Sequence, residues 1–120
     1  MPIEKIKFSA STGGIPVAIT FATNTTIHTT GTSSSIIDCI YLYAWNNAVS
    51  GTVNIEVRFG DGGGSGGTRT VIKQTITFGN LPVTILEGIP LRGNGTTGST
   101  LTVLSNNANT FVTGFVNRIS

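Results

Sequence analysis

The sequence is poor in the residues from which catalytic and covalent sites are built. Its one cysteine, Cys39, has no partner within the chain, so an internal disulfide bond is excluded. Its one histidine, His28, stands among threonines, and the spacing to Asp38 or Cys39 does not favour a catalytic pair. The acidic residues are spread along the chain and do not suggest a glycosidase pair. We therefore predict no enzyme and no catalytic residue, and interpret His28 as a strand-end or loop residue.

Charge is scarce as well. Charged residues make up 10 % of the chain, against about 25 % in a typical globular domain, and Thr, Ser, Asn and Gly take their place. The seven lysines and arginines are scattered, whereas nucleic-acid binding requires a basic cluster. Threonine suits the wet face of a strand. Such a surface is typical of a β-sandwich that packs against another molecule, although a merely neutral surface would have the same composition.

Long apolar runs are missing too. No stretch approaches the ~20 apolar residues of a membrane span, and the first 12 residues, MPIEKIKFSAST, lack the core of a signal peptide. The glycine-rich segment 60–67, GDGGGSGG, has one carboxylate, Asp61, which is too few oxygens for calcium. It also lacks the Gly-Lys-Ser/Thr ending of a phosphate-binding loop. We predict no metal and no cofactor, and interpret this segment as a hairpin tip between two strands.

What the chain does contain is strand periodicity, most clearly over residues 36–59. Residues 52–59 alternate between apolar and polar, as expected of a strand with one buried face. Residues 39–45 are apolar on both sides, because Ile40, Leu42 and Ala44 alternate with Tyr41, Tyr43 and Trp45. The closing strand 110–119 has the same property, with Phe111 and Phe115 on one face and valines on the other. A strand that is apolar on both faces needs cover on both.

The fold prediction is an all-β antiparallel sandwich of about eight short strands, because strands recur at intervals of about 8 to 12 residues between Gly, Asn and Ser turns. A jelly roll is one arrangement that fits. Residues 15–120 form a single domain, with a strand expected over 15–22. Residues 1–14 are an N-terminal arm or edge strand, and as an arm they could add a strand to the sheet edge of a partner.

Three interpretations of Tyr41, Tyr43 and Trp45 remain open from the sequence. They form an oligomer interface, where aromatic residues concentrate; they fill the inner face of a sheet while Ile40, Leu42 and Ala44 point outward; or they form a platform for carbohydrate. We favour the interface and predict that it involves Ile3, Ile6, Phe8, Tyr41, Tyr43, Trp45, Phe111 and Phe115.

A family resemblance rests on three segments: Thr26-Ile27-His28-Thr29, the strand Ile37-Asp38-Cys39-Ile40-Tyr41-Leu42-Tyr43-Ala44-Trp45-Asn46, and the closing Gly114-Phe115-Val116-Asn117-Arg118-Ile119. With the glycine-rich hairpin between them, they resemble small virion structural proteins of tailed bacteriophages, including phages of aquatic bacteria. The resemblance covers roughly residues 25–119 and carries over no functional residue. Capsid decoration (cement) proteins are the best match by size.

The resemblance implies a non-enzymatic β-sandwich on the outside of a virion, where it binds the major capsid protein and reinforces the shell. It also implies a homo-oligomer, with a trimer favoured, and no nucleic-acid or membrane partner. A tail, neck or head-fibre component is the first alternative. A carbohydrate-binding or receptor-binding module that uses Tyr41, Tyr43 and Trp45 is the second.

Overall fold

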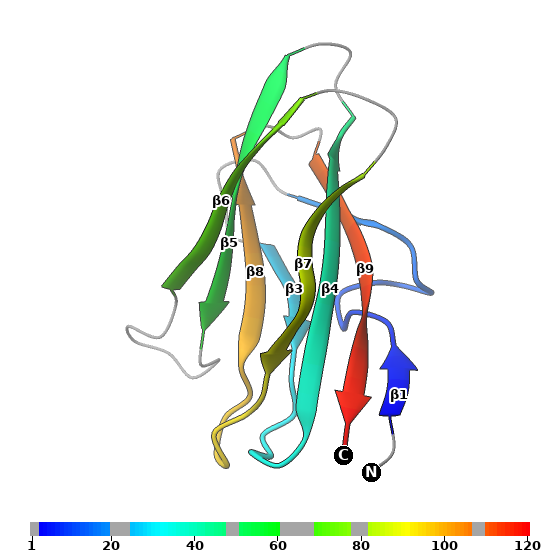
Figure 1. The fold of residues 1–120 in the computed structure, drawn as a ribbon, viewed down its shortest axis with the longest axis vertical. Helices are drawn as coiled ribbons and strands as arrows, with labels where there is room; N and C mark the ends of the chain where they lie inside the picture. The colour runs from blue at the N-terminus through cyan, green and yellow to red at the C-terminus, as the bar shows by residue number, and fades with distance from the viewer. Residues whose placement is uncertain (1–2, 20–24, 48–50, 61–68, 78–81, 107–109) are drawn as a thin grey trace.

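The structure, a computed structural model, describes residues 3–19, 25–47, 51–60, 69–77, 82–106 and 110–120, and within these ranges it is all-β. Two antiparallel sheets face each other (Figure 1), and the predicted sandwich is confirmed. Sheet A has five strands in the order β1-β9-β4-β7, with β2 also paired to β9, and sheet B has four in the order β3-β8-β5-β6. The strands are β1 Ile3–Ile6, β2 Val17–Ala18, β3 Thr25–Thr29, β4 Ile37–Asn46, β5 Thr52–Gly60, β6 Arg69–Thr77, β7 Val83–Leu91, β8 Thr100–Ser105 and β9 Thr110–Ile119.

The strand order is that of a jelly roll. Apart from the two-residue β2, the chain pairs first strand with last and continues inward: β1 with β9, β3 with β8, β4 with β7, and β5 with β6. The long hairpin is then wrapped so that β4 also pairs with β9, and β5 with β8. This is the double Greek key of an eight-stranded jelly roll. The two ends of the chain consequently lie side by side, with Ile3 opposite Ile119 (Figure 1).

The core between the sheets decides which face of β4 points inward. Ile40, Leu42 and Ala44 are fully buried in the core cluster that also contains Val53, Ile55 and Val57 of β5, while Tyr41, Tyr43 and Trp45 are only partly buried. The interpretation in which the aromatic residues fill the core is therefore wrong. Strand β9 follows the same rule, since Val112 and Val116 are fully buried. The aromatic side chains of both strands lie on the outer face of sheet A.

The N-terminal segment is packed onto the chain's own sandwich. Strand β1 pairs with β9 at the edge of sheet A, and Phe8 is 1 % exposed within the core. The Ala10 N–H then donates to the Ile27 carbonyl at 3.0 Å, which ties the segment to sheet B. Residues 3–11 thus cross from one sheet to the other and close the side of the sandwich. This corrects the expectation for Phe8, because a buried core side chain is not available to another chain.

Two strands differ in length from the prediction. Only Val17–Ala18 of the expected strand 15–22 pairs with β9, and Pro16, which has no N–H to donate, lies just before it; residues 20–24 lie outside the described residues. Strand β7, in contrast, runs unbroken from Val83 to Leu91, although residues 87–91 could be either a further short strand or a bend from the sequence. Strands β5 and β6 pair as the predicted hairpin, and its tip, residues 61–68, is outside the described residues. None of the described segments forms a helix capable of crossing a membrane.

Candidate functional site

The outer face of sheet A carries a stripe of five partly exposed aromatic residues, which we call the aromatic face: Tyr41, Tyr43, Trp45, Phe111 and Phe115. Tyr41 lies directly opposite Phe115 in the β4–β9 register, and Trp45 directly opposite Phe111. Both pairs are stacked, with ring centroids 4.7 Å and 5.6 Å apart and interplanar angles of 11° and 22°. Cross-strand aromatic pairs stabilise a sheet, and in these stacked pairs the ring faces are turned toward each other.

The neighbouring strands shape both sides of this stripe. On the β1 side, the Lys5 ammonium lies 4.5 Å from the Phe115 ring centroid, a cation–π contact. On the β7 side, Gly88 makes room for Tyr41, because a Cβ at Gly88 would come 3.1 Å from the tyrosine hydroxyl. Next to Gly88, the exposed Glu87 lies opposite Tyr41 in the β4–β7 register. The aromatic face therefore has a cation on one flank and an anion on the other.

A hollow of about 240 Å³ lies at one end of the aromatic face. Its lining consists of Ile15, Pro16, Trp45, Asn47 and Phe111. The Ile15 side chain is 63 % exposed, so it stands at the rim. At the other end of the face, Ile3 is 67 % exposed and lies beside Ile119 of β9. Large apolar side chains thus continue the surface beyond the aromatic stripe at both ends.

The outer face of sheet B is polar by comparison. Glu56 pairs with Arg58 and, at 3.6 Å, with Lys73, and Thr75 donates a hydrogen bond to Asn54. The hydrogen bond from Arg58 holds the pKa of Glu56 below its usual value. These are ordinary contacts of a solvated sheet surface. Among the described residues, the exposed aromatic side chains of the two sheets are therefore concentrated on the outer face of sheet A, whereas the outer face of sheet B adds one partly exposed leucine, Leu104.

Of the other residues predicted for the interface, Ile3 borders the aromatic face, whereas Ile6 is partly buried and packs against the core. Cys39 is partly exposed on the outer face of sheet A, opposite Asn117 of β9. It lies on the opposite side of the sheet from the buried Asp38, although the two are neighbours in the chain. Among the described residues, no group of three or more His, Cys, Asp and Glu side chains could hold a metal ion.

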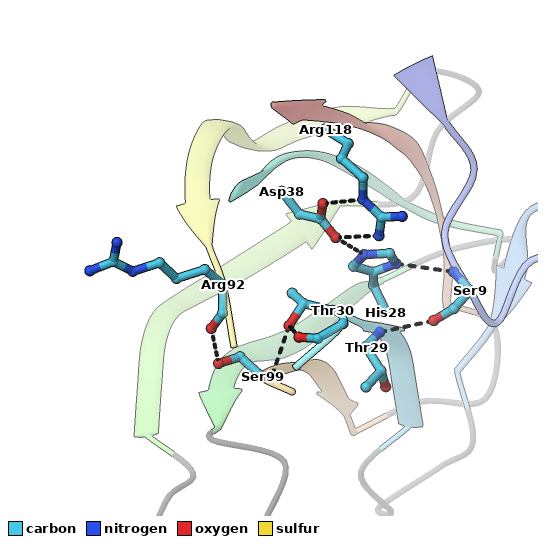
Figure 2. A network of polar contacts seen from close by, with 9 residues as sticks. Ser9, His28, Thr29, Thr30, Asp38, Arg92, Ser99 and Arg118 are labelled. Carbon is cyan, nitrogen blue, oxygen red and sulfur yellow. Dashed lines mark hydrogen bonds and ion pairs between the residues drawn. The ribbon is translucent and has the colours of Figure 1, made fainter. Parts of the chain in front are cut away.

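A second group of polar residues has a buried centre, His28 and Asp38, and partly or fully exposed partners, Arg118 and Ser9 (Figure 2). His28 of β3 points its Nε2 at Asp38 Oδ2 of β4, 2.8 Å away, and the two side chains are 2 % and 1 % exposed. Arg118 of β9 donates to the same carboxylate through Nε, to Oδ1 at 2.7 Å, and through Nη2, to Oδ2 at 2.9 Å. The Ser9 backbone N–H donates to His28 Nδ1 at 3.1 Å. One carboxylate thus joins strands from both sheets, and the imidazole joins them to the N-terminal segment.

The electrostatics of this cluster favour the ionised carboxylate. Burial by itself would raise the pKa of Asp38, but the hydrogen bonds from Arg118 and His28 and the charge of Arg118 outweigh it and hold that pKa below its usual value. Asp38 in turn raises the pKa of Arg118. Because His28 Nδ1 accepts from Ser9, the ring proton sits on Nε2 and faces Asp38. Both imidazole nitrogens are occupied within the protein, so neither can act on a substrate in this arrangement.

Sequence reasoning missed this cluster, although a signal was present. Asp38 falls on the same side of its strand as Ile40 and Leu42, and Arg118 on the same side as Val116. A charged residue in register with a core face needs a partner of opposite charge. An ion pair between Asp38 and Arg118 could therefore have been predicted from the sequence. His28 gave no such signal, because a β-bulge between Thr26 and His28 interrupts the alternation of β3.

Comparisons of the chain with protein-family models and with curated protein sequences found no match.

Proposed function

We propose that this chain is a non-enzymatic structural protein of a phage virion, of the capsid decoration type. We propose further that another protein chain binds its aromatic face. The observation that carries the proposal is the contrast between the two outer sheet faces. Sheet A presents stacked aromatic rings and sheet B presents ion pairs and threonines. Exposed apolar surface of this kind marks an interaction site, and aromatic residues are enriched where protein interfaces have their strongest contacts.

A jelly roll supports this role without implying it, since one fold serves many functions. A decoration protein binds a shell in many copies and needs a rigid body with contact surfaces. The cluster of His28, Asp38 and Arg118 provides rigidity, because it bonds three strands of the two sheets together. The N-terminal segment contributes to the same body, because β1 is an edge strand paired with β9 and Phe8 lies in the core. We propose that the capsid shell is bound through the major capsid protein.

Copy number per virion tests the proposal. The chain would be quantified by mass spectrometry in purified particles, relative to the major capsid protein. We expect an abundance close to that of the major capsid protein, together with an exterior position in a map of the particle. A few copies per particle would instead support a tail, neck or head-fibre component, and complete absence from particles would reject a virion role.

The hollow beside Trp45 favours a second candidate function, carbohydrate or receptor binding. Ligand sites are concave and mostly apolar, with a few polar groups that orient the ligand. The hollow has this character, with Trp45 and Phe111 among its apolar lining residues and Asn47 as the polar group. A glycan array probed with the wild-type chain and with Trp45→Ala separates the two functions. Binding that disappears in the variant would support this candidate, and an array without binding would reject it.

A further inference from the structure

We propose that the occupant of the aromatic face is the same face of a second copy of this chain, related by a twofold axis that runs along the seam between β4 and β9. The inference deepens the proposed function, because it names the chain that covers the aromatic face. It is carried by three observations: the position of the aromatic pairs on the sheet, the placement of two opposite charges, and the size of the face.

The aromatic pairs straddle the centre of the sheet. In the order β1-β9-β4-β7, the seam between β9 and β4 is the midline. A twofold axis along this midline places β4 of one chain over β9 of the other. Tyr41 then meets the partner's Phe115, and Trp45 meets the partner's Phe111, so that each stacked pair packs on its own equivalent. A twofold interface requires such a self-complementary patch.

The charges at the two flanks select the direction of the axis. Glu87 lies in the cross-strand row of Tyr41 and Phe115, and the Lys5 ammonium reaches the same row by lying over the Phe115 ring. An axis parallel to the strands exchanges the two flanks and brings Lys5 over the partner's Glu87, twice in each dimer. An axis across the strands keeps each flank on its own side, so Lys5 would not meet the partner's Glu87, and where such an axis passes through this row it would bring like charges together, which is unfavourable. Within the described residues, neither Lys5 nor Glu87 has an ion pair in its own chain.

The size of the face suits a stable dimer. Strands β4 and β9 have ten residues each, and four strands lie side by side. With β7 of nine residues and β1 of four beside them, at about 3.4 Å per residue and about 4.8 Å between strands, the face covers roughly 540 Å² per chain, or roughly 1,100 Å² for two, just above the ~1,000 Å² expected of a specific interface. Twisted sheets pack face to face with their strands nearly aligned, and an axis parallel to the strands produces this arrangement. The twofold contact takes the place of the trimer that the resemblance implies.

Charge reversal tests this arrangement in solution. Lys5→Glu and Glu87→Lys each create two like-charge contacts per dimer, and we expect each variant to dissociate at least about tenfold more readily than the wild type in analytical ultracentrifugation. An equimolar mixture of the two variants restores every opposite-charge pair, so the mixture should dimerise again. The double variant Lys5→Glu/Glu87→Lys should dimerise like the wild type. Lys73→Glu, on the outer face of sheet B, is the matched control and should leave dimerisation unchanged.

Recovery in the mixture is the decisive result, because general destabilisation of the fold cannot produce it. A wild-type chain that stays monomeric at millimolar concentration would overturn the inference, as would a trimer or single variants that dimerise normally. A mixture that remains monomeric would overturn it as well. A chain that is monomeric alone yet abundant on particles would assign the aromatic face to the shell, so that the proposed function stands while the twofold dimer fails.

Discussion

His28 Nε2 and Asp38 Oδ2 lie 2.8 Å apart between the two sheets, and this contact fastens sheet B to sheet A. The resemblance to a catalytic histidine–aspartate pair ends at the other ring nitrogen, which accepts a hydrogen bond from the Ser9 backbone. In a catalytic pair that nitrogen would be free to take a proton from a nucleophile. The contact therefore belongs to the architecture of the sandwich, and its removal should change stability.

Asp38→Asn should lower the free energy of unfolding by about 2 kcal/mol, less than the cost of breaking a fully buried ion pair because the Arg118 side chain is 31 % exposed. The variant leaves the Arg118 guanidinium and the buried imidazole without their shared anion. Urea denaturation followed by circular dichroism measures the change. Glu56→Gln, which removes a carboxylate from the exposed ion pairs of sheet B, is the control and should unfold like the wild type. Equal stability of the two variants would contradict the assignment.

The same carboxylate should make folding sensitive to acid. The pKa of Asp38 is lower in the folded chain than its ordinary value, so the folded state favours the ionised form. Its contribution is complete above the unfolded pKa of about 3.9 and is lost as the pH falls through the folded pKa. Denaturation curves between about pH 2 and pH 7 should show wild-type stability falling below about pH 4. Asp38→Asn should lack that part of the decrease, and an identical pH dependence would refute the coupling.

Gly114→Ala should be strongly destabilising, by more than about 2 kcal/mol. Gly114 of β9 has φ +148° and lies opposite Leu42 of β4. An added Cβ at this position would collide with the Tyr41 carbonyl oxygen. Because Gly114 and the Tyr41 carbonyl both belong to the backbone of paired strands, neither can shift without disturbing the β4–β9 hydrogen bonds. Gly31→Ala is the matched control, since a Cβ there meets nothing within 4 Å, and its melting temperature should be nearly unchanged. Comparable melting temperatures for the two variants would rule out this close approach of β4 and β9.

Cys39 should report directly on coverage of the aromatic face. It is the one thiol of the chain, partly exposed on the outer face of sheet A. If a second copy covers this face, the rate at which Cys39 reacts with an aromatic disulfide reagent should fall as protein concentration rises. In Lys5→Glu the rate should stay constant over the same range. A wild-type rate that does not depend on concentration would show that the face stays open.

Local alternation predicted much of the fold because it depends only on neighbouring residues. The period of two in residues 36–59 and 110–119 was enough to separate the two faces of β4, β5 and β9, and the five aromatic residues of sheet A were all among those predicted for an interface. The rule failed where backbone geometry interrupts it. Pro16 precedes β2, which is only two residues long. In the pairing of β4 with β7, the register shifts between Ile40 and Tyr41 and again between Leu42 and Tyr43.

The sequence by itself determined that this protein is an all-β sandwich with more apolar strand surface than polar cover, since both follow from the spacing of side chains along each strand. Only the tertiary structure decided the jelly-roll order, the burial of Phe8, and the meeting of His28 and Asp38 with an arginine 80 residues away from the aspartate. The physical reason is that strand pairing joins distant segments, and the alternation of side chains within one strand does not identify the strand with which it pairs.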